Sequence, residues 1–402
     1  GVTKPTKQQG VLMTDHITLD KTVAEEIGFD INALLEQLNG VTDMRQARGI
    51  RYSLTFLLGV IILAKLAGQH KPSAIAQWVK LRRRQLVKAF KCRRDTVPAL
   101  NTIRRTLSDA VASSELLPAL NRFLYETQGG QQSEQICLDG KSLRGTIPSG
   151  KTQGEHLLAA FLPAEGVVLA QEAVESKENE LVAAPKVLES LNLCGRVVTG
   201  DALFTQRNLS VQVLARGGDY LWPVKDNQAG LKEEVSLFFI PPRKAPGWYI
   251  KPLPQTTART VDKVHGRLQE RTLTAIVDET GFIDWPGVQQ VFRLVRKVTC
   301  LTTGVVTTDE TYGITSLPHD RASADQLLDL IRQHWRIENC LHYRRDVTLQ
   351  EDGTRMSNKQ QARAMAALNS FIIGLVSKLG FTNLAFAQRV FEAKLSMSLA
   401  LL

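Results

Sequence analysis

The pattern of hydrophobic and polar positions divides the chain into a helical front, a strand-rich middle and a helical end. Apolar residues recur at helical spacing between about residues 23 and 125, and the continuous apolar run LTFLLGVIILA at 54–64 predicts a buried helix. Short β-type runs begin after the glycine pair at 129–130, and helical spacing returns at Ser323. The pattern therefore predicts an α/β protein whose mixed sheet is preceded by an all-α domain and followed by C-terminal helices.

The strand-rich middle begins with three strands and then alternates helices with further strands. A turn at Gly166 joins the second and third strands as a hairpin. The strands are expected at 135–139, 156–162, 167–174, 196–202 and 219–224, and the helices at 180–191 and 209–216. Three strands, helix, strand, helix, strand is the order of an RNase H-like sheet, which we expect here as the catalytic core.

Alternating segments such as RTLTAIV and QVFRLVRKV follow, and they predict a β-rich insertion. The expected domains are a helical N-terminal DNA-binding or associated domain at 1–130, a catalytic domain formed by 131–230 and 317–402, and the insertion at 231–316.

Charge and cysteine usage narrow the class of protein. The 402 residues carry a net charge of +10, which fits a polyanionic partner such as nucleic acid without requiring one. Five scattered cysteines contain no Cys-x-x-Cys pair, so neither a disulfide framework nor a zinc site is indicated. The apolar run at 54–64 is too short to span a bilayer. We therefore expect a cytoplasmic protein without a membrane partner.

The segment GTIPSGKT at 145–152 matches the phosphate-loop pattern of nucleotide hydrolases. That motif requires a strand that runs straight into the glycine-rich loop and a helix that starts at the lysine. Here polar KSLR separates Asp139 from Gly145, and QGEHLLAAFL after Thr152 indicates a loop that enters a strand. A polar connection between strands is the better interpretation, and a P-loop NTPase remains the weaker alternative.

Two aspartates stand at the ends of apolar strands. Asp139 closes QICLD, and Asp201 closes RVVTGD. If the strands are neighbours, the two carboxylates meet and their repulsion requires a cation; oxygen ligands suit Mg²⁺. Taken singly, each aspartate could instead cap a turn or a helix.

A third carboxylate is expected from a helix, in the segment HWRIENCLHYRRDV. Trp335, Glu338 and His342 share one face of such a helix by their spacing. Rival carboxylates, ranked below Glu338, follow at Asp346, Glu351 and Asp352. We expect Trp335 to pack in the core, with stacking on a base as the alternative.

Five motifs resemble those of insertion-sequence transposases of the H-repeat-associated type. They are DGKSLRG (139–145), TGDALFTQ (199–206), DYLWPVKDNQ (219–228), HGRLQER (265–271) and HWRIENCLHYRRDV (334–347). In the helical front, DMRQARGIRYSLTFLLGVIILAKLAG (43–68) and PALNTIRRTL (98–107) also resemble the associated N-terminal domain of that family.

The resemblance implies membership of the DDE superfamily, which has an RNase H-like catalytic core. It places the acidic triad on Asp139, Asp201 and Glu338, with two Mg²⁺ ions per active site and Mn²⁺ as a substitute. The implied activity is cleavage at insertion-sequence ends and strand transfer into target DNA. A homodimer or larger assembly would act on double-stranded DNA at the bacterial nucleoid. A catalytically silent DNA-binding relative is the alternative.

The resemblance and the basic run KLRRRQLVKAFKCRR at 80–94 also suggest residues that contact DNA. A related signature, Tyr-x2-Arg-x3-Glu-x6-Lys, falls on Ile331, His334, Glu338 and Arg345, and so departs at its first two positions. The candidates are Arg82, Arg83, Arg84, Lys88, Lys91, Arg93, Arg94, Arg104, Arg105, Lys141, Arg144, Lys225, Asn227, Gln228, Arg267, His334 and Arg345. The alternative for the basic run is a solvated helix face.

Overall fold

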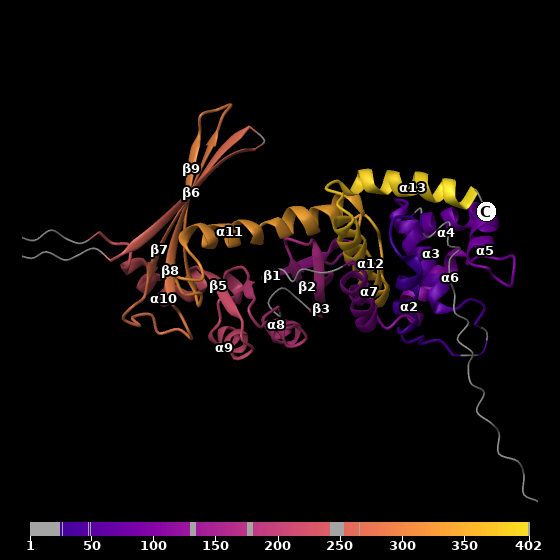
Figure 1. The fold of residues 1–402 in the computed structure, drawn as a ribbon, viewed down its shortest axis with the longest axis horizontal. Coiled ribbons are helices and arrows are strands. Elements are labelled where there is room, and N and C mark those ends of the chain that lie inside the picture. Colours follow the sequence, from indigo (N-terminus) through magenta and orange to yellow (C-terminus); the bar gives the residue numbers. More distant parts are fainter. Residues whose placement is uncertain are drawn as a thin grey trace, which may run out of the picture.

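The computed structural model describes residues 25, 27–46, 48, 50–128, 134–174, 180–241, 253–264 and 266–400. Figure 1 shows an elongated molecule, with the N-terminal helices at one end and the longest strands at the other. The expected domain boundary at 129–130 lies outside the described residues.

The helical half is built around α3 (Leu54–Leu66), which is buried along its whole length because nearly every side chain is apolar. Ser53 caps this helix by accepting a hydrogen bond from the Phe56 amide at 3.2 Å. The neighbouring elements are α2 (Ile31–Asn39), α4 (Pro72–Leu81), α5 (Arg83–Ala89), α6 (Leu100–Arg105), a π-helical turn (Thr106–Ala110) and α7 (Ser113–Gln128). Among the described residues, none of the helices is long and apolar enough to cross a bilayer.

In the described part of the chain, nine strands form one mixed sheet in the order β3-β2-β1-β4-β5-β9-β8-β7-β6. The first five are β1 (Gln135–Leu143), β2 (Glu155–Leu162), β3 (Val167–Val174), β4 (Val197–Thr199) and β5 (Asp219–Val224). β1 pairs antiparallel with β2 and parallel with β4, and β4 pairs parallel with β5. The expected hairpin around Gly166 is confirmed, since β2 and β3 are antiparallel.

The β-rich segment adds four strands to the same sheet. They are β6 (Gln255–Val264), β7 (Arg267–Val277), β8 (Gln290–Cys300) and β9 (Val306–Thr315). β9 pairs antiparallel with β5, so this segment prolongs the sheet beyond its parallel centre. The helix α10 (Ala229–Leu237) connects β5 to this extension.

Alternate residues of β1 face different layers, as expected for a strand. Ile136 and Leu138 pack in a core with α8 (Glu180–Glu189) and α9 (Arg207–Ala215). Cys137 packs on the opposite face, in a core with α12 (Lys359–Lys378) and α13 (Leu384–Ala400). α11 (Ala324–His334) packs on the extension and leads from it toward the helical half (Figure 1).

Candidate acidic active site

The strand pairing places Asp139 and Asp201 at equivalent positions. Cys137 and Thr199 are paired across the parallel strands β1 and β4, and each aspartate follows its paired residue by two positions. β1 does not end at Asp139 as expected but continues to Leu143, paired with β2. The two aspartates therefore occupy equivalent positions at the carboxyl-terminal side of the parallel pairing.

Glu338 is brought to these strands by the end of α11, which is fixed to the sheet by a polar chain. Gln135 Nε2 donates to Thr199 Oγ1 at 3.0 Å and to the Leu330 carbonyl at 2.8 Å. Thr199 Oγ1 lies 3.0 Å from His334 Nδ1. The last turn of α11 is therefore held directly over β1 and β4.

Beyond α11 the backbone forms two π-helical turns, Glu338–His342 and Arg344–Thr348. Such turns are rare and occur often at functional sites. His342 Nδ1 lies 3.4 Å from both Asp139 Oδ2 and Glu338 Oε2. One ligand atom from each of these three residues lies within 4.8 Å of the others, so the group could hold a metal ion. His342 was not predicted as a site residue, although its spacing of four from Glu338 was a usable signal.

Asp201 lies outside this three-residue group. Its Oδ1 accepts a hydrogen bond from the Leu203 amide at 2.8 Å and so caps the 3-10 turn Ala202–Phe204. The charges of Asp201 and Glu338 both act on His334 and favour its protonated form, but burial dominates and lowers the pKa of His334 to about 4. Asp201 therefore acts on the site through its charge interaction with His334, and its carboxylate caps the 3-10 turn.

Burial and like charge work against ionisation at the centre of the site. Burial is the main reason that the pKa of Asp139 rises to about 6; His342 opposes this rise and Glu338 adds to it. The pKa of Glu338 is lowered, chiefly by its hydrogen bond with His342. His342 is thus the neighbouring group that favours the ionised forms of Asp139 and Glu338.

Comparison with known proteins identifies the family. The family described as "Transposase DDE domain" matches residues 130–375, and the one described as "DDE_Tnp_1-associated" matches residues 35–124. The chain belongs to the transposase DDE-domain family.

Relatives of this family member cover nearly its whole length. "Putative transposase YncI" of Escherichia coli O157:H7 is 27% identical over 86% of this chain and 87% of its own. "H repeat-associated putative transposase YhhI" of Escherichia coli strain K12 is 23% identical over 87% of this chain and 91% of its own. A solved piggyBac transposase synaptic complex with hairpin DNA aligns with a TM-score of 0.41 at 9% identity, covering 95% of this chain and 79% of that one; this likeness is too weak to bear on the fold.

In this DDE-domain protein, the GTIPSGKT segment is not a phosphate loop. It forms a 3-10 turn and a loop between β1 and β2, and a strand rather than a helix follows Lys151. The local backbone structure explains why glycine occupies two positions of this segment. A Cβ on Gly145 would lie 2.3 Å from the Thr354 carbonyl oxygen, and Gly150 has a φ of +78° in a turn. The expected polar connection is confirmed.

Two of the expected DNA contacts lie inside the protein. Arg345 is fully buried, and its Nε lies 2.8 Å from Glu351. Lys141 is buried against Asp346, with Asp352 at 3.9 Å. Arg345 has no exposed surface and Lys141 is only 8% exposed, so in this structure both cations face acidic partners within the protein, and contact of either with DNA stays a prediction. These pairings engage all three rival carboxylates, and Asp352 also lies 3.8 Å from Arg144 Nε.

Three other candidates for DNA contact form hydrogen bonds within the protein, close to the acidic site. His334 points at Thr199 instead of solvent. Asn227 donates to the Ala202 carbonyl at 2.7 Å, and Gln228 donates to the Thr205 carbonyl at 2.9 Å. These two amides hold the loop that follows Asp201, which is a positioning role.

The remaining candidate cations differ in their contacts and in their exposure to solvent. Arg82 pairs with Glu392 and lies over the Trp78 ring, and Arg83 pairs with Asp95 at 3.1 Å. The solvent-exposed candidates are Arg84, Lys88, Lys91, Arg93, Arg94, Arg104, Arg105, Arg144, Lys225 and Arg267. Their contact with DNA stays a prediction.

Trp335 is not a core residue as expected, because 40% of its surface is exposed. The guanidinium groups of Arg271 and Arg296 lie 5.8 and 5.2 Å from its ring centroid. Such distances are those of cation–π contacts. The ring therefore lies at the surface three residues before Glu338, among cations.

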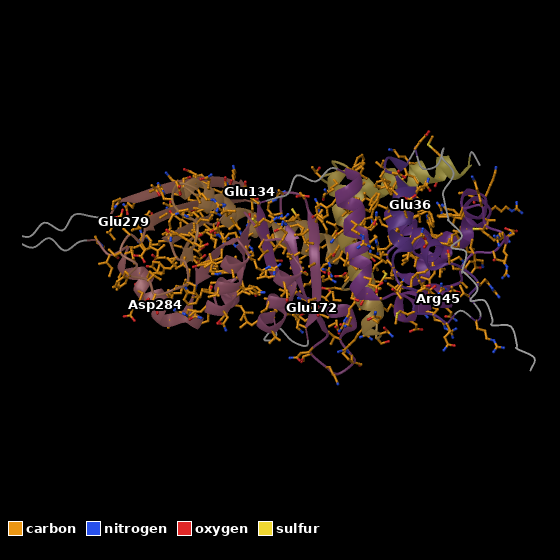
Figure 2. The ribbon with its side chains drawn as sticks, turned by 60° about the horizontal axis from the view of Figure 1, so that its bottom comes forward. Glu36, Arg45, Glu134, Glu172, Glu279 and Asp284 are labelled. Carbon is orange, nitrogen blue, oxygen red and sulfur yellow. The ribbon has the colours of Figure 1, made fainter. Side chains whose placement is uncertain are left out.

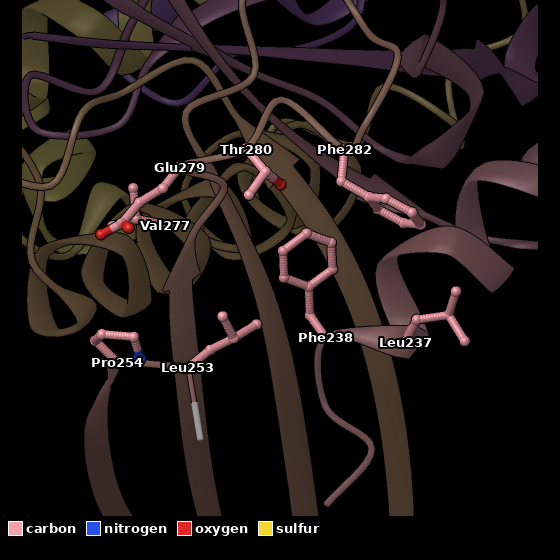
Figure 3. A pocket seen from close by; sticks show the side chains of 8 residues that line it. All are labelled: Leu237, Phe238, Leu253, Pro254, Val277, Glu279, Thr280 and Phe282. Atoms are coloured by element: carbon pink, nitrogen blue, oxygen red, sulfur yellow. The ribbon is translucent and has the colours of Figure 1, made fainter. Parts of the chain in front are cut away.

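An apolar hollow of about 270 Å³ lies apart from the acids, in the extension (Figure 3). The rings of Phe238 and Phe282 meet there edge to face at 5.7 Å. Glu279 is the one charged residue among those that line it. The hollow offers no pair of groups for acid–base chemistry, so the candidate site remains the acidic group on β1 and the π-helical turn.

Proposed function

We propose that this protein is a DNA transposase that cleaves insertion-sequence ends and joins them to target DNA by a DDE mechanism. The observation that carries the proposal is the meeting of Asp139 and Glu338, 199 positions apart in the sequence, within metal-ligand distance. The strand order β3-β2-β1-β4-β5, with β1, β4 and β5 parallel, supports an RNase H-like core.

The donor set fits a divalent cation. Asp139, Glu338 and Asp201 would hold Mg²⁺, since hard cations prefer carboxylate oxygens and the cap on Asp201 engages Oδ1. The nearby imidazole of His342 also suits Mn²⁺. When two such ions are bound, they lower the pKa of an attacking hydroxyl and stabilise the leaving oxygen of a phosphodiester. The crowded carboxylates would lose their mutual repulsion on binding.

The chain's own residues hold this arrangement in place. Neutral His334 and Thr199 fix the end of α11, so the backbone before Glu338 keeps its position over the sheet. Buried Lys141 stabilises the ionised form of Glu338 by its charge. Asn227 and Gln228 fix the loop after Asp201. A preorganised site of this kind avoids reorganisation during the reaction.

Joining two element ends to one target requires two active sites. We therefore infer a homodimer or larger assembly on double-stranded DNA, at the bacterial nucleoid.

The test is Mg²⁺-dependent cleavage of duplex DNA taken from both flanks of the coding region. Asp139→Asn, Asp201→Asn and Glu338→Gln should each lower the cleavage rate by on the order of a thousandfold, because a bound metal contributes several kcal/mol to the transition state. Lys151→Ala is the matched control and should cleave normally. Normal cleavage by the three acid variants would sink the proposal. DNA binding without cleavage in the unaltered protein would favour the silent relative.

A further inference from the structure

A cationic pocket forms in the helical half, far along the molecule from the extension. Figure 2 labels Arg45 in this half, whereas Glu279 and Asp284 lie at the opposite end. The pocket has a volume of about 270 Å³. It is lined by Arg45, Arg51, Tyr52, Thr102, Arg105 and Thr106. Every lining residue comes from one of two stretches, 43–68 and 98–107, and Arg105 is the one lining residue that the sequence already indicated as a DNA contact.

The two stretches are fixed to each other beside the pocket. Asp43 forms a β-bridge with Val111, and the Met44 amide donates to the Ala110 carbonyl at 3.0 Å. These contacts hold the loop before α3 against the π-helical turn that continues α6. The pocket is therefore a built feature of the domain and not a chance meeting of flexible side chains.

One arginine of the pocket is oriented in advance. Arg45 forms a two-pronged pair with Asp43, at 2.8 Å from Nε to Oδ1 and 2.6 Å from Nη2 to Oδ2. Its Nη2 also donates to the Tyr52 carbonyl at 3.0 Å. Asp43 balances one of the three guanidinium charges that line the pocket.

The other two arginines are exposed and have no acidic partner among the described residues. Arg51 and Arg105 thus present two uncompensated guanidinium groups at one concave place, next to the Tyr52 ring and the Thr102 side chain. A guanidinium fork matches the oxygens of a phosphate, which it binds in two-pronged fashion. Two arginines of the basic run at 80–94 differ from these, because Arg82 and Arg83 are engaged by Glu392 and Asp95.

We propose that this pocket binds a backbone phosphate of duplex DNA through Arg51 and Arg105, with Arg45 and Tyr52 shaping its wall. The proposal rests on the proposed function for the identity of the polyanion. It adds a second DNA contact, in the helical half, that is separate from the acidic site.

The experiment measures binding of a labelled mixed-sequence duplex to the full chain across a salt series. An Asp139→Asn background is used so that cleavage cannot interfere. Each lost phosphate contact lowers the slope of log K against log salt by about 1. Because both arginines contact the same phosphate, Arg51→Ala with Arg105→Ala should therefore lower the slope by about 1 and weaken binding by roughly tenfold or more at moderate salt. Because both side chains are exposed, the melting temperature should stay unchanged.

Arg122→Ala is the matched control, since it removes an exposed arginine from α7 of the same half, outside the pocket. It should leave the slope nearly unchanged. Arg51→Lys with Arg105→Lys keeps the charge and should restore most of the slope but only part of the affinity. A slope for the alanine pair equal to that of Arg122→Ala would overturn the proposal. Cleavage is measured in a separate assay, so the binding result can be interpreted even if the protein does not act by a DDE mechanism.

Discussion

Gly140, next to Asp139 on β1, leaves space for a buried pair of side chains, His156 and Glu180. On the face opposite Asp139, His156 Nε2 lies 2.6 Å from Glu180 Oε1, and Ser142 Oγ lies 2.8 Å from His156 Nδ1. A Cβ on Gly140 would lie 2.1 Å from that glutamate oxygen and 2.6 Å from the imidazole nitrogen. The buried pair can pack against β1 only because this position has no side chain.

Gly140→Ala should therefore displace the strand beside Asp139. We expect the free energy of unfolding to fall by about 1–3 kcal/mol, as for other overpacked cores, and the cleavage rate to fall with it. Chemical denaturation and the cleavage assay measure the two effects. Gly230→Ala is the control, since nothing lies near the Cβ it would add. A Gly140→Ala protein as stable and active as that control would contradict the packing argument.

Single residues were predictable from the sequence where local pattern determined them. Asp139 and Glu338 followed from an apolar strand and a helical spacing, and the structure brings both together. The acidic partners of Arg345 and Lys141 were not predictable, because they are set by tertiary packing. Lys141 meets an acid 205 positions away, which no local pattern of charges reveals.

At the scale of elements, the junction of α11 with β1 and β4 determines where Glu338 lies. Thr199 Oγ1 is shared by Gln135, His334 and the Cys137 thiol, which lies at 3.4 Å. Removal of this hydroxyl would take one hydrogen-bond partner each from Gln135, which keeps its bond to the Leu330 carbonyl, and from His334. Such a loss costs about 1–3 kcal/mol.

Thr199→Val should consequently loosen the end of α11. We expect the turnover rate at saturating DNA to fall roughly tenfold or more while DNA affinity stays close to normal, because positioning of Glu338 is affected and the exposed cations are not. Thr199→Ser retains the hydroxyl and should restore most of the rate. If the valine and serine variants turned over equally fast, the junction would have no positioning role.

Most elements were predictable because periodicity reports burial of one face. The boundaries were less so. β1 runs on through Lys141 and Ser142 as far as Leu143, because pairing with β2 continues there and Lys141 is buried. The helical pattern that runs through residues 75–90 is divided at Arg82 into α4 and α5. Neither feature changes the apolar spacing from which the elements were inferred.

For the whole molecule, local pattern identified the β-rich segment but not its attachment. The pairing of Leu221 with Thr315 makes that segment a continuation of the central sheet. Register between strands so distant in sequence is set by packing in three dimensions. Local pattern likewise could not predict the junction of the two halves, where α3 contacts α12 and α13.

Lys65 lies at this junction and gives a test of how the halves are joined. The side chain is fully buried, and its Nζ has no hydrogen-bond partner among the described residues. Burial lowers the pKa of Lys65 from 10.5 to about 8, against the opposing charge of Glu351. The folded state therefore binds the lysine proton less tightly than the unfolded chain does, which costs stability at neutral pH.

Lys65→Met should stabilise the protein, because methionine has a similar length and carries no charge. The gain should be about 3 kcal/mol below pH 8, where the full penalty applies. It should shrink as the pH rises from about 8 toward 10.5, because the unaltered protein then folds with a neutral lysine at progressively lower cost. Denaturant unfolding at several pH values measures the difference. Lys80→Met, at an exposed position of α4, should show no such convergence. A constant difference between Lys65→Met and the unaltered protein across this range would show that the buried charge is not what separates them.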